Sequence, residues 1–499
     1  MTPSAKTSPK PPAKATPMGR LAYCRMFENP PRVVLLVLPL LLSGCAIGPR
    51  FHPPRLAIPG HFLSAPQDAR PAWPTKTWWR GFRSPALDTF MAEAEQHNFT
   101  IRIAVAQLEA ANAEVQVLGA PLLPTLDANG GGQWQRAPQA PIAFGTTHNV
   151  SNRQFSASLQ ASYELDFWGK NRDALRGAEA SAAASRFNRD TVALTALSAV
   201  ATTWFQILAD RAALTIGLHN LAAAQTLLAQ LKAELLAGTT DAVAVAQQSA
   251  LVASERATIP TLRSQLRQEI LALGILVGKP PELLTIPRER LATLTVPKIM
   301  SGLPAQILER RPDIAEAQEN LIAANAKVRG AIADFFPAIN LTGSTGWTST
   351  ALNAVLAPGS LLLSAAASVT QPIFEGGALT GELAVARATY KEDVAIYEES
   401  VVQAFTDVDT ALNSLHYATE HERREAEAVA EARAALQAVR AQLAAGIVDV
   451  SAVLTAEETL LTNENSYTQA QLARLDAAVS LYEALGGGWQ MPARRSLGH

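Results

Sequence analysis

The chain contains two copies of one sequence pattern, and this internal repeat constrains its fold more than any other feature. The segment LEAANAEV (108–115) recurs as LIAANAKV (321–328), with six identities in eight positions at an offset of 213 residues. After Gly130 and its counterpart Gly343 the offset drops to 208, where KAELLAGTTD (232–241) aligns with RAQLAAGIVD (440–449). A repeat of this length predicts two tandem units of about 210 residues that build one architecture.

Proline clusters mark the borders of the two repeats. Eight prolines lie between Pro49 and Pro85, and four lie between Pro280 and Pro297. Such segments lack the periodicity of packed helices or strands. We therefore expect a signal peptide over 1–44, an extended strap over 45–85, a first repeat over 86–278, an inter-repeat linker in an equatorial region over 279–301, a second repeat over 302–488 and a tail over 489–499.

The N-terminus reads as an export signal. Six basic residues precede an apolar stretch over 33–42, which meets Ser43, Gly44 and Cys45. This order is typical of a secretory signal, and Leu-Ser-Gly-Cys matches a bacterial lipoprotein signal, which would make Cys45 the first mature residue, carrying diacylglycerol and an N-acyl group such as palmitate. The alternative is an ordinary secretory signal with an incidental cysteine. The apolar run is too short for a membrane-spanning helix, and Met1, Met18 and Met26 remain possible starts.

Four segments have the period-two polarity of strands, at about 122–136, 153–168, 335–349 and 361–374. In the second, Phe155, Leu159 and Tyr163 alternate with Ser158 and Gln160, which places apolar groups on one face and polar groups on the other. A soluble sheet with one solvated face would show the same pattern. An exported lipoprotein favours a membrane sheet, and each segment is long enough to cross a bilayer when tilted.

Four membrane strands cannot close on themselves. An open edge cannot face lipid, and single-chain bacterial barrels begin at about eight strands. Several copies must therefore share one barrel, and three copies would supply twelve strands.

Long helices account for the rest of each repeat. No proline interrupts 142–259 or 373–491, and helix-favouring residues dominate 169–237 and 378–445. A helix of about 69 residues would reach about 100 Å, with Gly217 as a possible bend. Gly238 and Gly446 suit the turn after a helix, and Asp241 and Asp449 suit the start of the returning helices, which we expect to end near Val277 and Leu485. Ordinary long coiled coils on a lipoprotein are the alternative.

Several apparent sites have structural explanations. The segment Gly274–Lys279 (GILVGK) lacks the spacing and hydroxyl residue of a phosphate-binding loop. His416 and His421 are five residues apart, a poor spacing for a shared metal. Arg310, Arg311 and Asp313 surround Pro312 at a helix start, and Gly130–Gly132 predicts relief of crowding or a bulge within a strand. No basic patch suggests nucleic acid, and no catalytic constellation suggests an enzyme.

Six stretches in order resemble an outer-membrane factor of the TolC-like class, in its NodT-type lipoprotein branch. They are TWWRGFRSPALDTF (77–90), SYELDFWGKNR (162–172), GLPAQILERRPDIAEAQENLIAANA (302–326), ADFFPAINLTG (333–343), QPIFEGGALTGEL (371–383) and LYEALGGGW (481–489). The resemblance implies a mixed α and β membrane protein: a homotrimer whose twelve-stranded outer-membrane β-barrel, four strands per chain, continues as a twelve-helix periplasmic α-barrel. It also implies a passive conduit for drugs or other small molecules, without a cofactor, docked through a periplasmic adaptor to an inner-membrane (RND-type) pump.

The helix tips carry the candidate gate. The resemblance implies a constriction at the second tip, where relatives often place an aspartate within a VLDA stretch. Thr455 stands at that position here, after Leu454, which puts an acidic gate in doubt. Asp449 could form an alternative ring, although its role at the helix start explains it more simply. The tip candidates are Gly238, Asp241, Gly446, Asp449, Ser451, Leu454 and Thr455. A scaffold lipoprotein that spans the periplasm without conducting is the alternative function.

Overall fold

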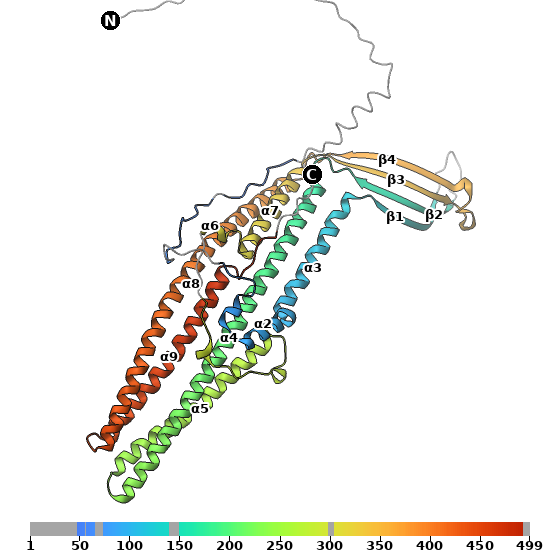
Figure 1. Ribbon diagram of the computed structural model, residues 1–499. Coiled ribbons are helices and arrows are strands. Elements are labelled where there is room, and N and C mark those ends of the chain that lie inside the picture. The colour runs from blue at the N-terminus through green and yellow to red at the C-terminus, as the bar shows by residue number, and fades with distance from the viewer. Residues whose placement is uncertain (1–46, 55, 65–72, 139–148, 298–303, 493–499) are drawn as a thin grey trace, which may run out of the picture. The chain divides into compact units, whose positions relative to one another are not determined.

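The computed structural model describes residues 47–54, 56–64, 73–138, 149–297 and 304–492. The segment Met1–Ala46 forms a unit of its own outside these residues, and Ile47–His499 forms the second unit. Within the second unit the same order of elements occurs twice (Figure 1). The first set is α2 Pro85–His97, α3 Phe99–Gly119, β1 Thr125–Pro138, β2 Asn149–Glu164, α4 Lys170–Ala237 and α5 Ala242–Leu276. The second is α6 Pro304–Ile307, α7 Pro312–Ala333, β3 Ala338–Ser349, β4 Leu361–Thr370, α8 Ala378–Ala444 and α9 Val450–Ala484.

Short 3-10 helices punctuate the connections. They are η1 Trp78–Phe82, η2 Ala120–Leu122, η3 Pro281–Leu283, η4 Leu291–Thr293, η5 Leu352–Ala354 and η6 Pro358–Ser360.

The four strands form one antiparallel sheet in the order β1-β2-β3-β4 (Figure 1). The strands contain 14, 16, 12 and 10 residues. Among the described residues, the outer edges of β1 and β4 have no strand partner. Long unpaired edges expose rows of backbone donors and acceptors, so this sheet needs further strands to complete its hydrogen bonding.

Two expectations about the strands need correction. The second strand ends at Glu164 rather than near 168, because Asp166 leaves the sheet and accepts the backbone N–H groups of Asn171 and Arg172 at the start of α4. Of the two roles expected for Gly130–Gly132, relief of crowding or a bulge, the bulge is wrong, since every residue of β1 has one partner in β2 without a skip. Gly132 lies instead against the ring of Phe155, where an added Cβ would stand 3.4 Å away.

The long helices are continuous. Helix α4 contains 68 residues and α8 contains 67, which at about 1.5 Å per residue is about 100 Å. Gly217 does not break α4; it lies against Leu262 and Ile259 of α5. Helix α4 is long and apolar enough along part of its length to cross a membrane by composition, but half of that stretch is buried within the protein. Contacts with α3, α5, α7 and α9 explain its apolarity.

The described part of the proline-rich strap packs against the helices. Phe62 is buried beside Ile314, Tyr397 and Leu481, and the strap residues Phe51, Leu56 and Trp73 pack against the same cluster. Further along, Trp78, Trp79 and Phe82 join a second cluster with Trp204 of α4 and Tyr482 of α9. The N-terminal segment thus holds the helices of both repeats together.

Candidate functional site

The tip between α4 and α5 is closed by a glycine and an aspartate. Gly238 adopts φ +75°, and the N–H of Thr239 donates to Glu234 O at 3.0 Å. Asp241 caps α5 by accepting the N–H of Ala244 at 2.8 Å. The left-handed glycine satisfies the last carbonyls of one helix and the carboxylate satisfies the first donors of the next.

The tip between α8 and α9 repeats this geometry. Gly446 adopts φ +71°, and the N–H of Ile447 donates to Gln442 O at 2.9 Å. Asp449 accepts the N–H of Ala452 at 3.2 Å and the hydroxyl of Ser451. The Ser451 hydrogen bond, together with the Ala452 N–H, lowers the pKa of Asp449 below its usual value. Asp449 is therefore held ionised and engaged at the helix start.

Residues after this tip divide between core and surface. Val453 is fully buried against Val429, Leu436 and Leu460, whereas Leu454 is half-buried and Thr455 is exposed. Thr455 donates to Ser451 O at 3.0 Å, and Thr459 donates to Thr455 O at 2.7 Å. The exposed face of the tip at this level therefore presents neutral hydroxyls where the family pattern expects a carboxylate.

The strand register collects the polar residues on one face of the sheet. Asp127, Gln160, Ser344 and Ser364 are successive cross-strand partners, and the Ser344 and Ser364 hydroxyls lie 2.7 Å apart. The neighbouring row contains Ala128, Leu159, Thr345 and Leu363. Alternation in each strand is thus aligned across all four strands, which produces a mainly polar face and a mainly apolar one.

Ion pairs join the two repeats where the helices meet the sheet. Lys170 Nζ lies 2.7 Å from Asp334 Oδ1, and this hydrogen bond raises the pKa of Lys170. Asp173 of α4 is fully buried and binds Arg329 of α7, with Nε 3.1 Å from Oδ2, and Arg176 of its own helix. The sequence contained no signal that distinguished these pairs from exposed charges.

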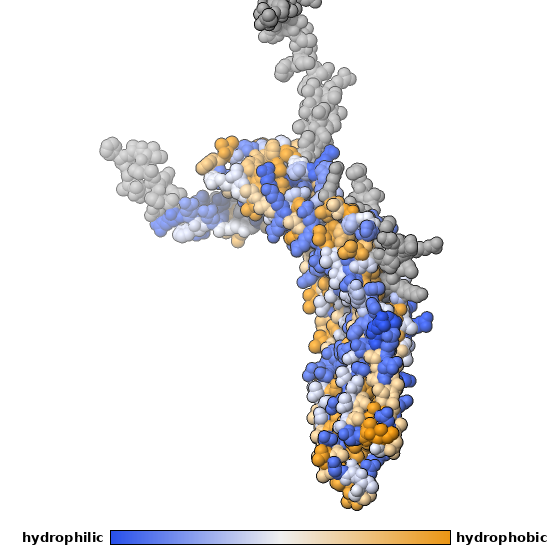
Figure 2. Space-filling model, turned by 90° about the vertical axis from the view of Figure 1, so that its left-hand side faces the viewer, coloured by the Kyte–Doolittle hydropathy of each residue, from blue (hydrophilic) through white to orange (hydrophobic). Residues whose placement is uncertain are grey.

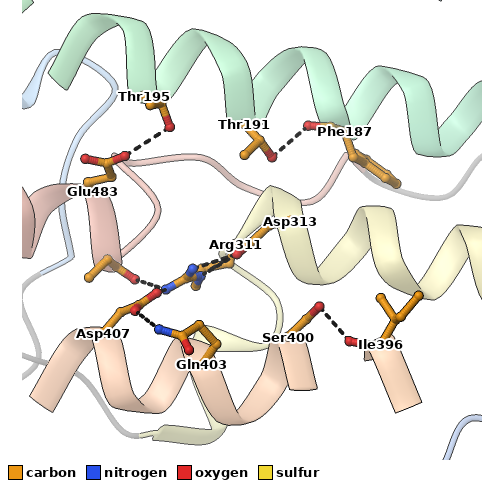
Figure 3. Close-up of polar contacts among 11 residues, drawn as sticks. Phe187, Thr191, Thr195, Arg311, Asp313, Ile396, Ser400, Gln403, Asp407 and Glu483 are labelled. Atoms are coloured by element: carbon orange, nitrogen blue, oxygen red, sulfur yellow. Dashed lines mark hydrogen bonds and ion pairs between the residues drawn. The ribbon is translucent and has the colours of Figure 1, made fainter. Parts of the chain in front are cut away.

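Arg311 links three helices (Figure 3). Its guanidinium binds Asp313 in α7, Asp407 in α8 with Nη1 2.9 Å from Oδ2, and Ala484 O at the end of α9. In the same region Glu483 accepts the hydroxyl of Thr195 in α4 at 3.0 Å (Figure 3). The side chain of Arg311 is 11% exposed. These contacts support the structural interpretation of Arg311 and Asp313.

The other apparent sites also have local partners. Lys279 of the GILVGK segment pairs with Glu93, and Gly278 packs on the backbone of His97. His421 lies 3.9 Å from Glu425. In the described part of the chain no group of three His, Cys, Asp or Glu residues is placed to hold a metal ion. Cys45 lies outside the described residues.

Burial identifies two carboxyls that no sequence pattern distinguishes from exposed ones. Burial raises the pKa of Asp476 in α9 to about 7. Burial and the nearby charge of Asp313 raise the pKa of Glu316 in α7 to about 7 as well. Asp476 lies between the buried residues Leu475 and Ala477, and Glu316 lies between the buried residues Ala315 and Ala317.

Comparison with known proteins places this geometry in a family. Residues 91–279 and 303–487 match the family described as outer membrane efflux protein, one match for each repeat. The chain is 35% identical over 454 residues to the pyoverdine export outer membrane protein OpmQ of Pseudomonas aeruginosa, covering 90% of this chain and 95% of OpmQ. It is 28% identical over 466 residues to the cation efflux system protein CusC of Escherichia coli, covering 92% of this chain and 100% of CusC.

Solved structures agree. A crystal structure of CusC, 28% identical, matches with a TM-score of 0.80 over 89% of this chain and 100% of the CusC chain. The open-state MtrE outer membrane channel of Neisseria gonorrhoeae, 27% identical, matches with a TM-score of 0.80 over 89% of this chain and 99% of the MtrE chain. These matches confirm the predicted fold class, a trimeric β-barrel with four strands per chain continued by periplasmic helices, and an outer-membrane location. The chain belongs to the outer membrane efflux protein family, as the outer-membrane channel component of an efflux system.

Proposed function

We propose that three copies of the chain form a passive conduit, which a periplasmic adaptor couples to an inner-membrane pump. The observation that carries this proposal is the four-stranded sheet, with a polar face in register and two unpaired edges, joined directly to two long helical hairpins. Closing the sheet with two further copies satisfies both edges and turns the polar face inward, which is the only arrangement of polar groups that lipid tolerates.

The cargo is a small molecule that the pump selects. OpmQ is a pyoverdine export protein, CusC belongs to a cation efflux system, and TtgI of Pseudomonas putida to a toluene efflux pump. Because related channels serve cargoes this different, we infer that the cargo is selected elsewhere in the assembly. The chain itself carries no reaction, and energy comes from the partner pump.

Single-channel conductance of the purified protein in planar bilayers tests the conduit. The tip of α9 limits the current in the closed state, so Leu454→Ala with Thr455→Ala is expected to increase conductance. Trimers that insert but never conduct, even with both substitutions, would favour the scaffold function. Circular dichroism distinguishes the conduit from the scaffold before any bilayer measurement, because a scaffold without a barrel would show helix with little sheet.

We also propose that Cys45 carries the lipid anchor. This proposal rests on the Leu-Ser-Gly-Cys order at the end of the apolar stretch. Mass spectrometry of the mature N-terminal peptide is expected to show a diacylglycerol thioether; an unmodified cysteine would contradict the proposal.

A further inference from the structure

Helices α3 and α7 share a sequence motif but differ in burial. None of the residues Leu108–Val115 in α3 is buried, whereas six of the eight residues Leu321–Val328 in α7 are. In α3, Ile103 is 58% exposed and Val117 is 60% exposed. Sequence preference cannot explain the difference, because six of the eight motif residues are identical. The difference must come from a neighbour that α7 has and α3 lacks.

That neighbour is identified by the helix contacts. Each motif helix packs on the long helix of its own repeat, α3 on α4 and α7 on α8. Helix α7 also packs extensively on α4, the long helix of the other repeat. By the same relation, α3 should also pack on the long helix of the other repeat. That helix is α8, supplied by a second copy of the chain. Repeats that continue around a closed ring reuse the same contact at every step.

Helix α8 has the matching free face. Val385 in α8 corresponds to Gly177 in α4, at the offset of 208, and Ala113 in α3 corresponds to Ala326 in α7. A Cβ at Gly177 would stand 3.6 Å from the Cβ of Ala326. Val385 is 66% exposed and Ala113 is exposed in the single chain. Figure 2 shows hydrophobic residues spread among hydrophilic ones on the visible helical surface, rather than a uniformly polar covering.

The polar contacts that join the repeats inside the chain have no counterparts at this position. In the other repeat, Gln116 stands at the position of Arg329 and Gly381 at the position of Asp173. Likewise, Ala378 stands at the position of Lys170 and Pro121 at the position of Asp334. For the Thr195–Glu483 hydrogen bond, Gln403 stands at the position of Thr195 and Ile275 at the position of Glu483. Ile275 is 71% exposed in the single chain. All three pairs are thus replaced by groups that cannot form the same bond.

We propose that the seam between copies consists of α3 and the end of α5 of one copy against α8 of the next, packed without the three polar contacts that fasten the equivalent seam inside each chain. This proposal rests on the trimeric conduit and adds which residues meet in it. Because Val385 replaces Gly177, the helices also stand farther apart at this seam. The assembly therefore alternates between interfaces within chains that contain these polar contacts and interfaces between chains that lack them.

Cysteine cross-linking tests the residue pairing. The mature sequence contains no cysteine besides Cys45, and a disulfide needs Cβ atoms about 3.5–4.5 Å apart. Because the helices stand farther apart at the seam between copies, Ala113→Cys with Val385→Cys is expected to produce covalent dimers and trimers with a short bis-methanethiosulfonate reagent. Gly177→Cys with Ala326→Cys is the matched control within one chain, and it should give an internal disulfide without larger species.

A second control uses the neighbouring position. Glu114 corresponds to Lys327, which stays exposed in α7, so Glu114→Cys with Val385→Cys should not cross-link. Native trimers that cross-link through Glu114→Cys but not through Ala113→Cys would overturn the pairing and leave the conduit intact. Absence of any trimer before oxidation would instead count against the conduit itself.

Installing the missing ion pair tests the second part. Gln116→Arg with Gly381→Asp recreates between copies the Arg329–Asp173 pair, whose Nε and Oδ2 atoms are 3.1 Å apart within the chain. The double variant is expected to dissociate in SDS at a higher temperature than wild type, while neither single variant does. A double variant no more resistant than the singles would show that these positions do not meet.

Discussion

Asp476 in α9 imposes a cost on folding that depends on pH. Its Oδ1 atom is buried without a hydrogen-bond partner, and the adjacent Leu475 and Ala477 are buried too. Burial raises the pKa of Asp476 from 3.8 to about 7, because the ionised carboxylate loses its hydration. At about 1.36 kcal/mol for each pKa unit, this difference amounts to about 4 kcal/mol per chain as an upper limit.

The direction of the pH effect follows from proton binding. Between about pH 4 and pH 7 the folded chain holds a proton on Asp476 that the unfolded chain has released. Stability therefore falls as the pH rises through this window, and the full cost is present above about pH 7. Asp476→Asn cannot ionise, so it should be more stable than wild type at pH 8 and little different from it at pH 4.

Thermal unfolding in detergent at pH 4, 6, 7 and 8 measures the effect. The pKa of Glu316 is also raised to about 7, so the stability of Asp476→Asn should still depend partly on pH. Adding Glu316→Gln should remove this remaining dependence. Glu431→Gln is the matched control, since Glu431 is an exposed carboxylate on α8. If Asp476→Asn and Glu431→Gln have the same midpoints and slopes, the reasoning from burial is refuted.

Three further predictions concern the packing and the tip. Arg311→Ala removes the hydrogen bonds to Asp313, Asp407 and Ala484 O, and because the two carboxylates left behind are 32% exposed it should lower the free energy of unfolding by about 1–3 kcal/mol, measured by denaturant unfolding; an unchanged midpoint would contradict this. Gly488→Ala places a Cβ 2.3 Å from the backbone of Thr75, whereas Gly446→Ala meets no atom within 4 Å; both have positive φ, so trimer yield should fall far more for Gly488→Ala. Thr455→Asp adds three carboxylates near the tip, and its single-channel current should become sensitive to divalent cations in a way that the wild-type current is not.

Much of the local structure could be predicted because it depends on neighbours in sequence. The absence of proline predicted helices that the structure extends over 68 and 67 residues. Alternation predicted the polar positions Gln160 and Ser344, which the register then places side by side. Strand ends were less accurate, since Asp166 fits the alternating pattern and is used instead to cap α4.

Long-range partners could not be predicted in the same way. Asp476 looks like any charged residue of a helix, and only the packing of α9 on α4 and α8 makes it a buried carboxyl. The strap was expected to be extended, but nothing in its prolines indicated that Phe62 and Trp73 would join a core with α7 and α8. Such contacts depend on residues hundreds of positions away, whose identity a local pattern does not contain.

Divergence between the two repeats does contain part of this information. Matched positions that keep their character, such as Gly238 and Gly446 or Asp241 and Asp449, perform the same local task in each hairpin. Asp173 and Gly381 are also matched, yet one is a buried ion-pair partner within the chain and the other is exposed on the single chain. In a ring of duplicated units each repeat meets a different neighbour on this side, so charges that pair within the chain have no reason to be retained in the other repeat. The positions where the repeats differ in charge therefore indicate which interface lies within one chain and which one forms between copies.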